Sequence, residues 1–101
     1  MKTIQINRGN VIVSGMGADV EWVGRTEPEK FQAALAYARE TVNAGDTTIV
    51  QMAAQRALAA EAANTSGKLM ASKYAGEDAA TGQEFRAGTK IYYYNHGAYV
   101  A

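Results

Sequence analysis

Apolar and polar residues alternate in short runs near the start of the chain, at residues 4–6, 11–13 and 20–23. Two glycine-containing segments, Gly9-Asn10 and Gly15-Met16-Gly17, separate these runs. A period of two is typical of strands that bury one face, and glycine segments between such strands favour tight turns. The pattern predicts an N-terminal antiparallel β-meander of three strands.

The periodicity becomes helical after residue 25. Thr26 is expected to cap a helix that has Pro28 in its first turn and that ends at Asn43-Ala44-Gly45. Apolar residues on this helix recur at a spacing that forms one stripe: Phe31, Leu35, Ala38 and Val42. Trp22, on the preceding strand, is predicted to pack in the core against Phe31 or Leu35.

A second helix is predicted from Asp46 or Thr47 to about Asn64. It is rich in alanine, a strong helix former whose small side chain lets two helices approach closely. This helix is therefore expected to pack against the first one or against a second copy of itself. Residues 64–67 predict a break, followed by a third helical stripe over residues 69–74. One helix that continues through the break is the alternative.

The last third of the chain predicts strands again. Residues 83–85 and 89–94 are expected to be strands joined across a glycine-containing turn, and a second turn at 95–97 leads to a strand at 98–100. These segments predict a C-terminal β-hairpin or small meander. A chain of 101 residues supports one modest core. The predicted fold is a single α+β domain, residues 1–101, with two or three helices between the meander and the hairpin.

Charge and composition narrow the functional class. Ten lysine and arginine residues balance ten aspartate and glutamate residues without runs of either sign, which leaves no strong electrostatic footprint for duplex DNA or an anionic membrane. No apolar run approaches the roughly 18 residues that a membrane span needs, and the chain does not start like a signal peptide. The lack of cysteine excludes disulfides and is compatible with a reducing compartment. A cytoplasmic protein without a membrane partner is expected.

A pattern of glycines and aromatic residues occupies residues 72–94. In order, it contains Lys73, Tyr74, Gly76, Gly82, Phe85, Gly88, Ile91 and Tyr93. The segment resembles a zinc-ribbon-like module of small phage and bacterial proteins that has lost its cysteines, with Asp78 and Thr81 at the positions of two thiolates. A structural zinc needs four ligands, and this chain offers one histidine and no thiolate, so neither metal nor cofactor is expected. The resemblance implies a phage or bacterial protein that handles nucleic acid.

The strand at residues 90–94 carries the candidate binding face. If Ile91 and Tyr93 point inward, the alternation of a strand places the other three residues together on the opposite face: Lys90, Tyr92 and Tyr94. There the tyrosines would stack on unpaired bases while nearby cations contact phosphate. The same face would also suit a protein interface or, under a covering helix, belong to the core. The candidate binding residues are Lys73, Arg86, Lys90, Tyr92, Tyr94 and His96, the last of which is expected in a solvated turn.

No nucleophile–base pair, carboxylate dyad, metal cage or complete phosphate loop is recognisable in the sequence, and an enzyme is therefore not expected. The first functional prediction is a small accessory protein that binds single-stranded nucleic acid, or a nucleic-acid-processing complex, through the aromatic and cationic strand. The second is a phage-encoded inhibitor or adaptor that binds a host enzyme or defence system, to which a neutral charge is no obstacle. The third is a structural subunit of a homo-oligomer, assembled through the alanine-rich helix or the terminal strand edges.

Overall fold

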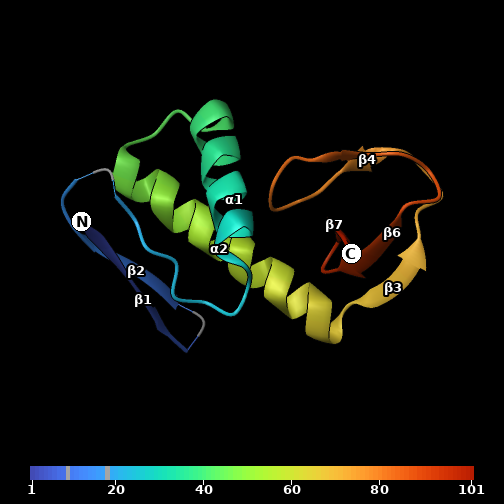
Figure 1. The fold of residues 1–101 in the computed structure, drawn as a ribbon, viewed down its shortest axis with the longest axis horizontal. Coiled ribbons are helices and arrows are strands. Elements are labelled where there is room, and N and C mark those ends of the chain that lie inside the picture. Colours follow the sequence, from blue (N-terminus) through green and yellow to red (C-terminus); the bar gives the residue numbers. More distant parts are fainter. Residues whose placement is uncertain (9, 18) are drawn as a thin grey trace.

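A long helix joins the two ends of the molecule in the computed structural model, which describes residues 1–8, 10–17 and 19–101 (Figure 1). This helix is α2, Asp46–Ser66, and α1, Pro28–Thr41, packs beside it. One end of the molecule carries β1 (Lys2–Asn7) and β2 (Asn10–Gly15). The other end carries β3 (Lys68–Ala71), β4 (Gly76–Glu77), β5 (Glu84–Phe85), β6 (Lys90–Tyr94) and β7 (Gly97–Val100). The α+β class predicted from the sequence is confirmed.

The strands β1 and β2 form the first antiparallel hairpin that the alternation predicts. Their turn includes Gly9, which lies outside the described residues. Residues 20–23, predicted as a third strand, contribute only a single parallel bridge between Val20 and Lys2. The chain reverses at Gly15, whose φ of 93° suits glycine, and returns beside β1 instead of beside β2. The predicted three-stranded antiparallel meander is therefore wrong in its third strand.

Trp22 turns into the first of two cores instead of extending the sheet. Its ring stacks on Phe31 of α1, with centroids 4.9 Å apart and planes 10° from parallel, which confirms the predicted contact. A glycine is required at position 24, because a Cβ on Gly24 would lie 2.1 Å from the indole ring. Small side chains bring α1 and α2 together, and five of them are 0% exposed: Ala34, Ala38, Ala53, Ala54 and Ala57.

Polar contacts accompany the starts of both helices. The helix α1 begins at Pro28, and Thr26 is not the cap that the sequence predicts, because its amide and hydroxyl both donate to Glu61 of α2. The helix α2 begins at Asp46, whose carboxylate lies 2.5 Å from the buried ammonium of Lys2. The hydrogen bond from Lys2 holds the pKa of Asp46 below its ordinary value. This contact attaches β1 to the first turn of α2.

The helix α2 ends at the predicted break, but a strand follows it. Gly67 leaves the helix with extended backbone, at φ −78° and ψ 167°. Residues 68–71 then pair with β6 as strand β3. The predicted third helical stripe and the alternative of a continuous helix are both wrong. A short isolated helix is only marginally stable, whereas pairing with β6 gives the backbone groups of residues 68–71 hydrogen-bond partners.

The C-terminal strands form a three-stranded antiparallel sheet in the order β3-β6-β7, and a separate short pair, β4-β5. The predicted hairpin between β6 and β7 is confirmed. Its turn residues Asn95 and His96 have φ of 48° and 65°, the positive values that a tight two-residue hairpin turn requires. The predicted pairing of residues 83–85 with 89–94 is wrong, since β5 pairs with β4.

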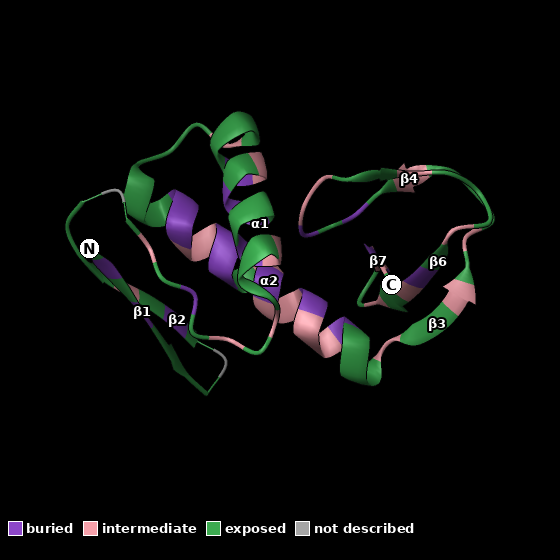
Figure 2. Ribbon diagram, viewed as in Figure 1, coloured by how far each residue is buried: buried purple, intermediate pink, exposed green. Residues whose placement is uncertain are grey.

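A smaller second core joins this sheet to the end of α2. Its buried members are Ala60, Ala63, Ala80 and Tyr99, with Ala59, Tyr92 and Tyr94 packed partly buried against them. Burial raises the pKa of Tyr99, and the nearby Asp78 carboxylate acts in the same direction. Figure 2 shows buried positions along α2 from one core to the other. The helix α2 is therefore the element that both cores share.

Candidate functional site

A buried carboxylate organises the loop between β4 and β5. Asp78 is 2% exposed. Its Oδ1 accepts hydrogen bonds from the amides of Ala80, at 2.8 Å, and Thr81, at 3.0 Å, and its Oδ2 accepts one from the amide of Val100 at 2.8 Å. A carboxylate tolerates burial when such donors replace water. Asp78 therefore ties its own loop to β7.

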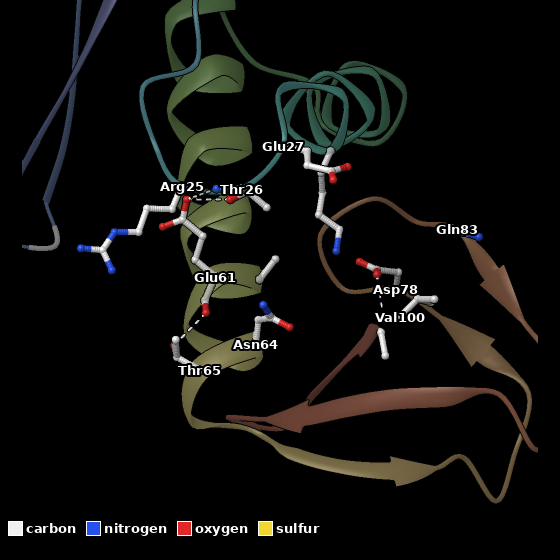
Figure 3. Close-up of a pocket in the computed structure, with 12 residues that line it drawn as sticks. Arg25, Thr26, Glu27, Glu61, Asn64, Thr65, Asp78, Gln83 and Val100 are labelled. Atoms are coloured by element: carbon white, nitrogen blue, oxygen red, sulfur yellow. Dashed lines mark hydrogen bonds between the residues drawn. The ribbon is translucent and has the colours of Figure 1, made fainter.

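A cleft of 630 Å³ lies between the start of α1, the second half of α2 and this loop (Figure 3). On its α2 wall, Glu61 Oε1 accepts hydrogen bonds from the amide and the hydroxyl of Thr26, at 2.5 and 2.7 Å. Asp78, on another wall, is occupied by backbone amides. The other charged side chains of the cleft are Arg25, Glu27 and Lys30. The cleft lies between the two cores, and the carboxylates of Glu61 and Asp78 in it are hydrogen-bonded within the protein and stabilise the fold.

Backbone hydrogen bonds join two loops at the far end of the C-terminal sheet, and exposed cations lie beside the bonded residues. The amide of Ser72 donates to the carbonyl of Thr89 at 2.8 Å, and the amide of Gly88 donates to the carbonyl of Ser72 at 2.7 Å. These bonds join the loop that follows β3 to the loop that precedes β6 (Figure 1). Four exposed charged or aromatic residues lie within two positions of these bonded residues along the chain, and we call this region the distal tip: Lys73, Tyr74, Arg86 and Lys90.

Tyr74 is the most exposed aromatic side chain of the molecule, at 78%. The hydroxyl of Ser72 fixes its backbone, because it accepts from the amide of Tyr74 at 3.3 Å and donates to its carbonyl at 2.5 Å. An exposed ring on a fixed backbone is available to stack on a flat partner. Sequence reasoning assigned Tyr74 to a helical stripe and missed it as a binding residue, although its position directly after Lys73 was a signal.

A groove of 740 Å³ opens beside the distal tip. The half-buried ring of Phe85 and the exposed side chain of Arg86 both line it, so an apolar surface and a cation share one groove. Glu77 and Glu84 lie directly opposite each other on β4 and β5, and both also line the groove. Their charges repel anions there, which makes the cationic loops the more favourable place for phosphate.

Comparisons of the chain with protein-family models, curated proteins and solved structures find no match. Neither α1 nor α2, the helices of the described residues, is long and apolar enough to cross a membrane. Across the same residues, no three acidic or histidine side chains lie close enough together to hold a metal ion.

The remaining sequence-predicted residues lie apart from the distal tip. Tyr92 and Tyr94 are half-buried against the second core, which is the covered arrangement that the sequence left open. Tyr93, assumed to point inward, is instead 47% exposed, with Lys68 opposite it on β3. His96 is exposed in the β6–β7 turn, as expected. Of the predicted binding residues, three belong to the distal tip: Lys73, Arg86 and Lys90.

Proposed function

We propose that this protein is a non-enzymatic accessory protein that binds single-stranded nucleic acid through the distal tip. The observation that supports the proposal most is the pair of backbone hydrogen bonds at Ser72, which join two loops whose neighbouring residues include three exposed cations and one exposed tyrosine. The cations would neutralise neighbouring phosphates, and the ring would stack on an unpaired base, a contact that contributes about 1–3 kcal/mol.

The distribution of charge supports a single strand as the ligand. Residues 67–101 contain four cations and three acids, and one of the acids, Asp78, is buried. The exposed surface of this region is therefore cationic, although the whole chain is neutral. Duplex binding depends on many phosphate contacts, whereas a single strand also offers bases for stacking. A surface with few cations and one free ring thus favours the single strand.

Fluorescence anisotropy of a short labelled oligothymidylate, titrated at several salt concentrations, tests the proposal. With three phosphate contacts, the logarithm of the association constant is expected to fall against the logarithm of salt with a slope of about −2. Tyr74→Ala is expected to weaken binding about tenfold by loss of stacking, and Arg86→Gln to reduce both the affinity and the salt slope.

Arg25→Gln is the matched control, because it removes another exposed arginine, in the cleft and away from the distal tip. Its binding is expected to equal that of the parent protein. The proposal is wrong if no binding occurs at low salt, or if Arg25→Gln weakens binding as much as Arg86→Gln does.

A further inference from the structure

The strand β1 has an open outer edge. Along an antiparallel strand, the N–H and C=O of successive residues point to alternate sides. Lys2 points away from β2, since its amide donates to the carbonyl of Asp19 at 2.9 Å. The same alternation directs both backbone groups of Ile4 and Ile6 outward. In the described part of the chain, the bridge at Lys2 is the only one that covers this edge.

Two other strand edges are covered. On the outer edge of β2, the carbonyl of Val11 accepts from Gln51 Nε2 of α2 at 3.0 Å. On the outer edge of β7, the amide of Ala79 donates to the carbonyl of Ala98 at 2.9 Å, and Asp78 binds the next outward amide. The edge of β1 has no comparable cover beyond Lys2 within the described residues. An open edge of this kind is a template for another strand.

The side chains at this edge favour an added strand. Ile4 is 3% exposed and lies on the inner face of the hairpin, whereas Ile6 lies on the same face but is 37% exposed. A strand placed beside β1 would cover Ile6 and extend the inner face. It would also stabilise the hairpin, because a two-stranded sheet is only marginally stable by itself.

We propose that the occupant of this edge is β1 of a second copy of the chain, in an antiparallel pairing with its two-fold axis at Gln5. In this register, Ile4 of each copy exchanges backbone hydrogen bonds with Ile6 of the other. All outward backbone groups of both isoleucines are then paired. The two hairpins form one continuous sheet in which both copies use the same patch, as a two-fold interface requires.

The register also brings opposite charges together. The next position beside Lys2 is already taken by Val20, so the strand of the second copy must end there, at its own turn residue Arg8. Val20 is flanked by two exposed acids, Asp19 and Glu21. Each exposed Arg8 therefore meets acids of the other copy, and the symmetry forms this contact twice. This complementarity favours a second copy over an unrelated extended peptide.

Sedimentation equilibrium of the full chain over a range of concentrations tests the proposal. A reversible dimer is expected, and Ile6→Lys, which places a charge on the inner face at the edge, is expected to raise its dissociation constant at least about tenfold. Ile12→Lys is the matched control. Ile12 is also an exposed isoleucine of the hairpin, at 50%, but it lies on the opposite face from Ile6 and on the other strand, β2. This variant should leave the dimer unchanged, and the emission of Trp22 checks that both variants fold.

A charge exchange tests the register itself. Arg8→Glu is expected to weaken the dimer, and adding Asp19→Lys in the same chain is expected to restore it. A monomer at every concentration overturns the proposal, as does a dimer that Ile6→Lys and Ile12→Lys weaken equally. A monomeric chain that binds an extended peptide at β1 would also overturn it, because the occupant would then not be a second copy.

Discussion

The two ends of the molecule are stabilised in different ways. The first core is apolar, with the Trp22–Phe31 stack and closely packed alanines of α1 and α2. The second core is smaller, with three alanines and Tyr99 buried and two further tyrosines partly buried against them, and beside it the Asp78 carboxylate accepts hydrogen bonds from three backbone amides. Apolar burial is non-directional and tolerates small shifts, whereas a buried polar network is stable only when each member has its partner. The comparison shows how a carboxylate stabilises a region that has little apolar surface to bury.

The ends are also joined to each other through Tyr37 of α1. Its hydroxyl donates to Glu77 of β4 at 3.4 Å, and the guanidinium of Arg56 on α2 lies 5.3 Å from its ring centre. The ring itself lies against Gly82 in the Asp78 loop, where a Cβ would come within 2.3 Å. The loop therefore packs against α1 as well as against β7. A substitution that disrupts the loop is expected to lower the stability of both ends, but to different degrees.

Removal of the Asp78 carboxylate should show the largest difference in stability between the two ends of the molecule. Asp78→Ala leaves three backbone donors without their acceptor, and a buried unpaired donor costs about 1–3 kcal/mol, so a loss of about 3 kcal/mol or more is expected. Trp22 is the only tryptophan and lies in the first core, so its emission reports on that end alone. We expect the near-ultraviolet dichroism of the C-terminal tyrosines to be lost while the Trp22 emission persists.

Asp78→Asn is the control for this prediction, because it keeps one acceptor oxygen and should be less destabilising than Asp78→Ala. If the tryptophan and tyrosine signals of Asp78→Ala disappear in a single transition, the two ends do not differ as described. A stability equal to that of the parent protein would show that the three hydrogen bonds contribute little.

Alanine substitutions at two glycines that both have a positive φ test whether the Asp78 loop packs against Tyr37. Gly82 and Gly88 have φ of 71° and 92°, but a Cβ on Gly88 would meet nothing within 4 Å. Gly88→Ala is expected to cost about 1 kcal/mol from backbone strain alone, and Gly82→Ala about 2 kcal/mol or more because the methyl group also displaces Tyr37. Urea denaturation measures both.

Tyr37→Ala in the Gly82→Ala background should recover part of the lost stability, since the displaced ring is then absent. Equal destabilisation by Gly82→Ala and Gly88→Ala would mean that the loop does not press on α1.

The features that could be predicted from the sequence are those decided by residues close together along the chain. The alternation of β1 and β2, the two long helices and the β6–β7 turn all depend on local periodicity or turn chemistry. The Trp22–Phe31 contact follows from the apolar stripe of α1. The helical stripe predicted over residues 69–74 is wrong, because residues 68–71 pair with β6, which lies far along the chain, and its ladder overrides the local pattern.

The candidate site shows the same limit. Alternation correctly predicts that Tyr92 and Tyr94 share a face, but it does not indicate which face the helix α2 covers. Tyr93 is therefore the exposed residue of β6, and the half-buried tyrosines belong to the core. The distal tip depends on hydrogen bonds between Ser72 and residues 88–89, which no local pattern indicates. Lys73, Arg86 and Lys90 could thus each be predicted as a candidate binding residue, but the loop junction that they share with Tyr74 could not.

Acidification should affect the first end through the contact of Lys2 with Asp46. The pKa of Asp46 is lowered in the folded protein by its hydrogen bond to Lys2, so the contact stabilises the fold above pH 3.8, the ordinary value, and this contribution is lost as the pH falls through the lowered pKa. This loss of stability should be smaller than those expected for Asp78→Ala and Gly82→Ala, because the Asp46 side chain is 46% exposed and solvent screens its ion pair with Lys2. Urea midpoints of the parent protein and Asp46→Asn should differ at neutral pH and converge in acid. If the difference between the two urea midpoints stays constant below pH 3.8, the charge of the Asp46 carboxylate does not stabilise the contact between β1 and α2.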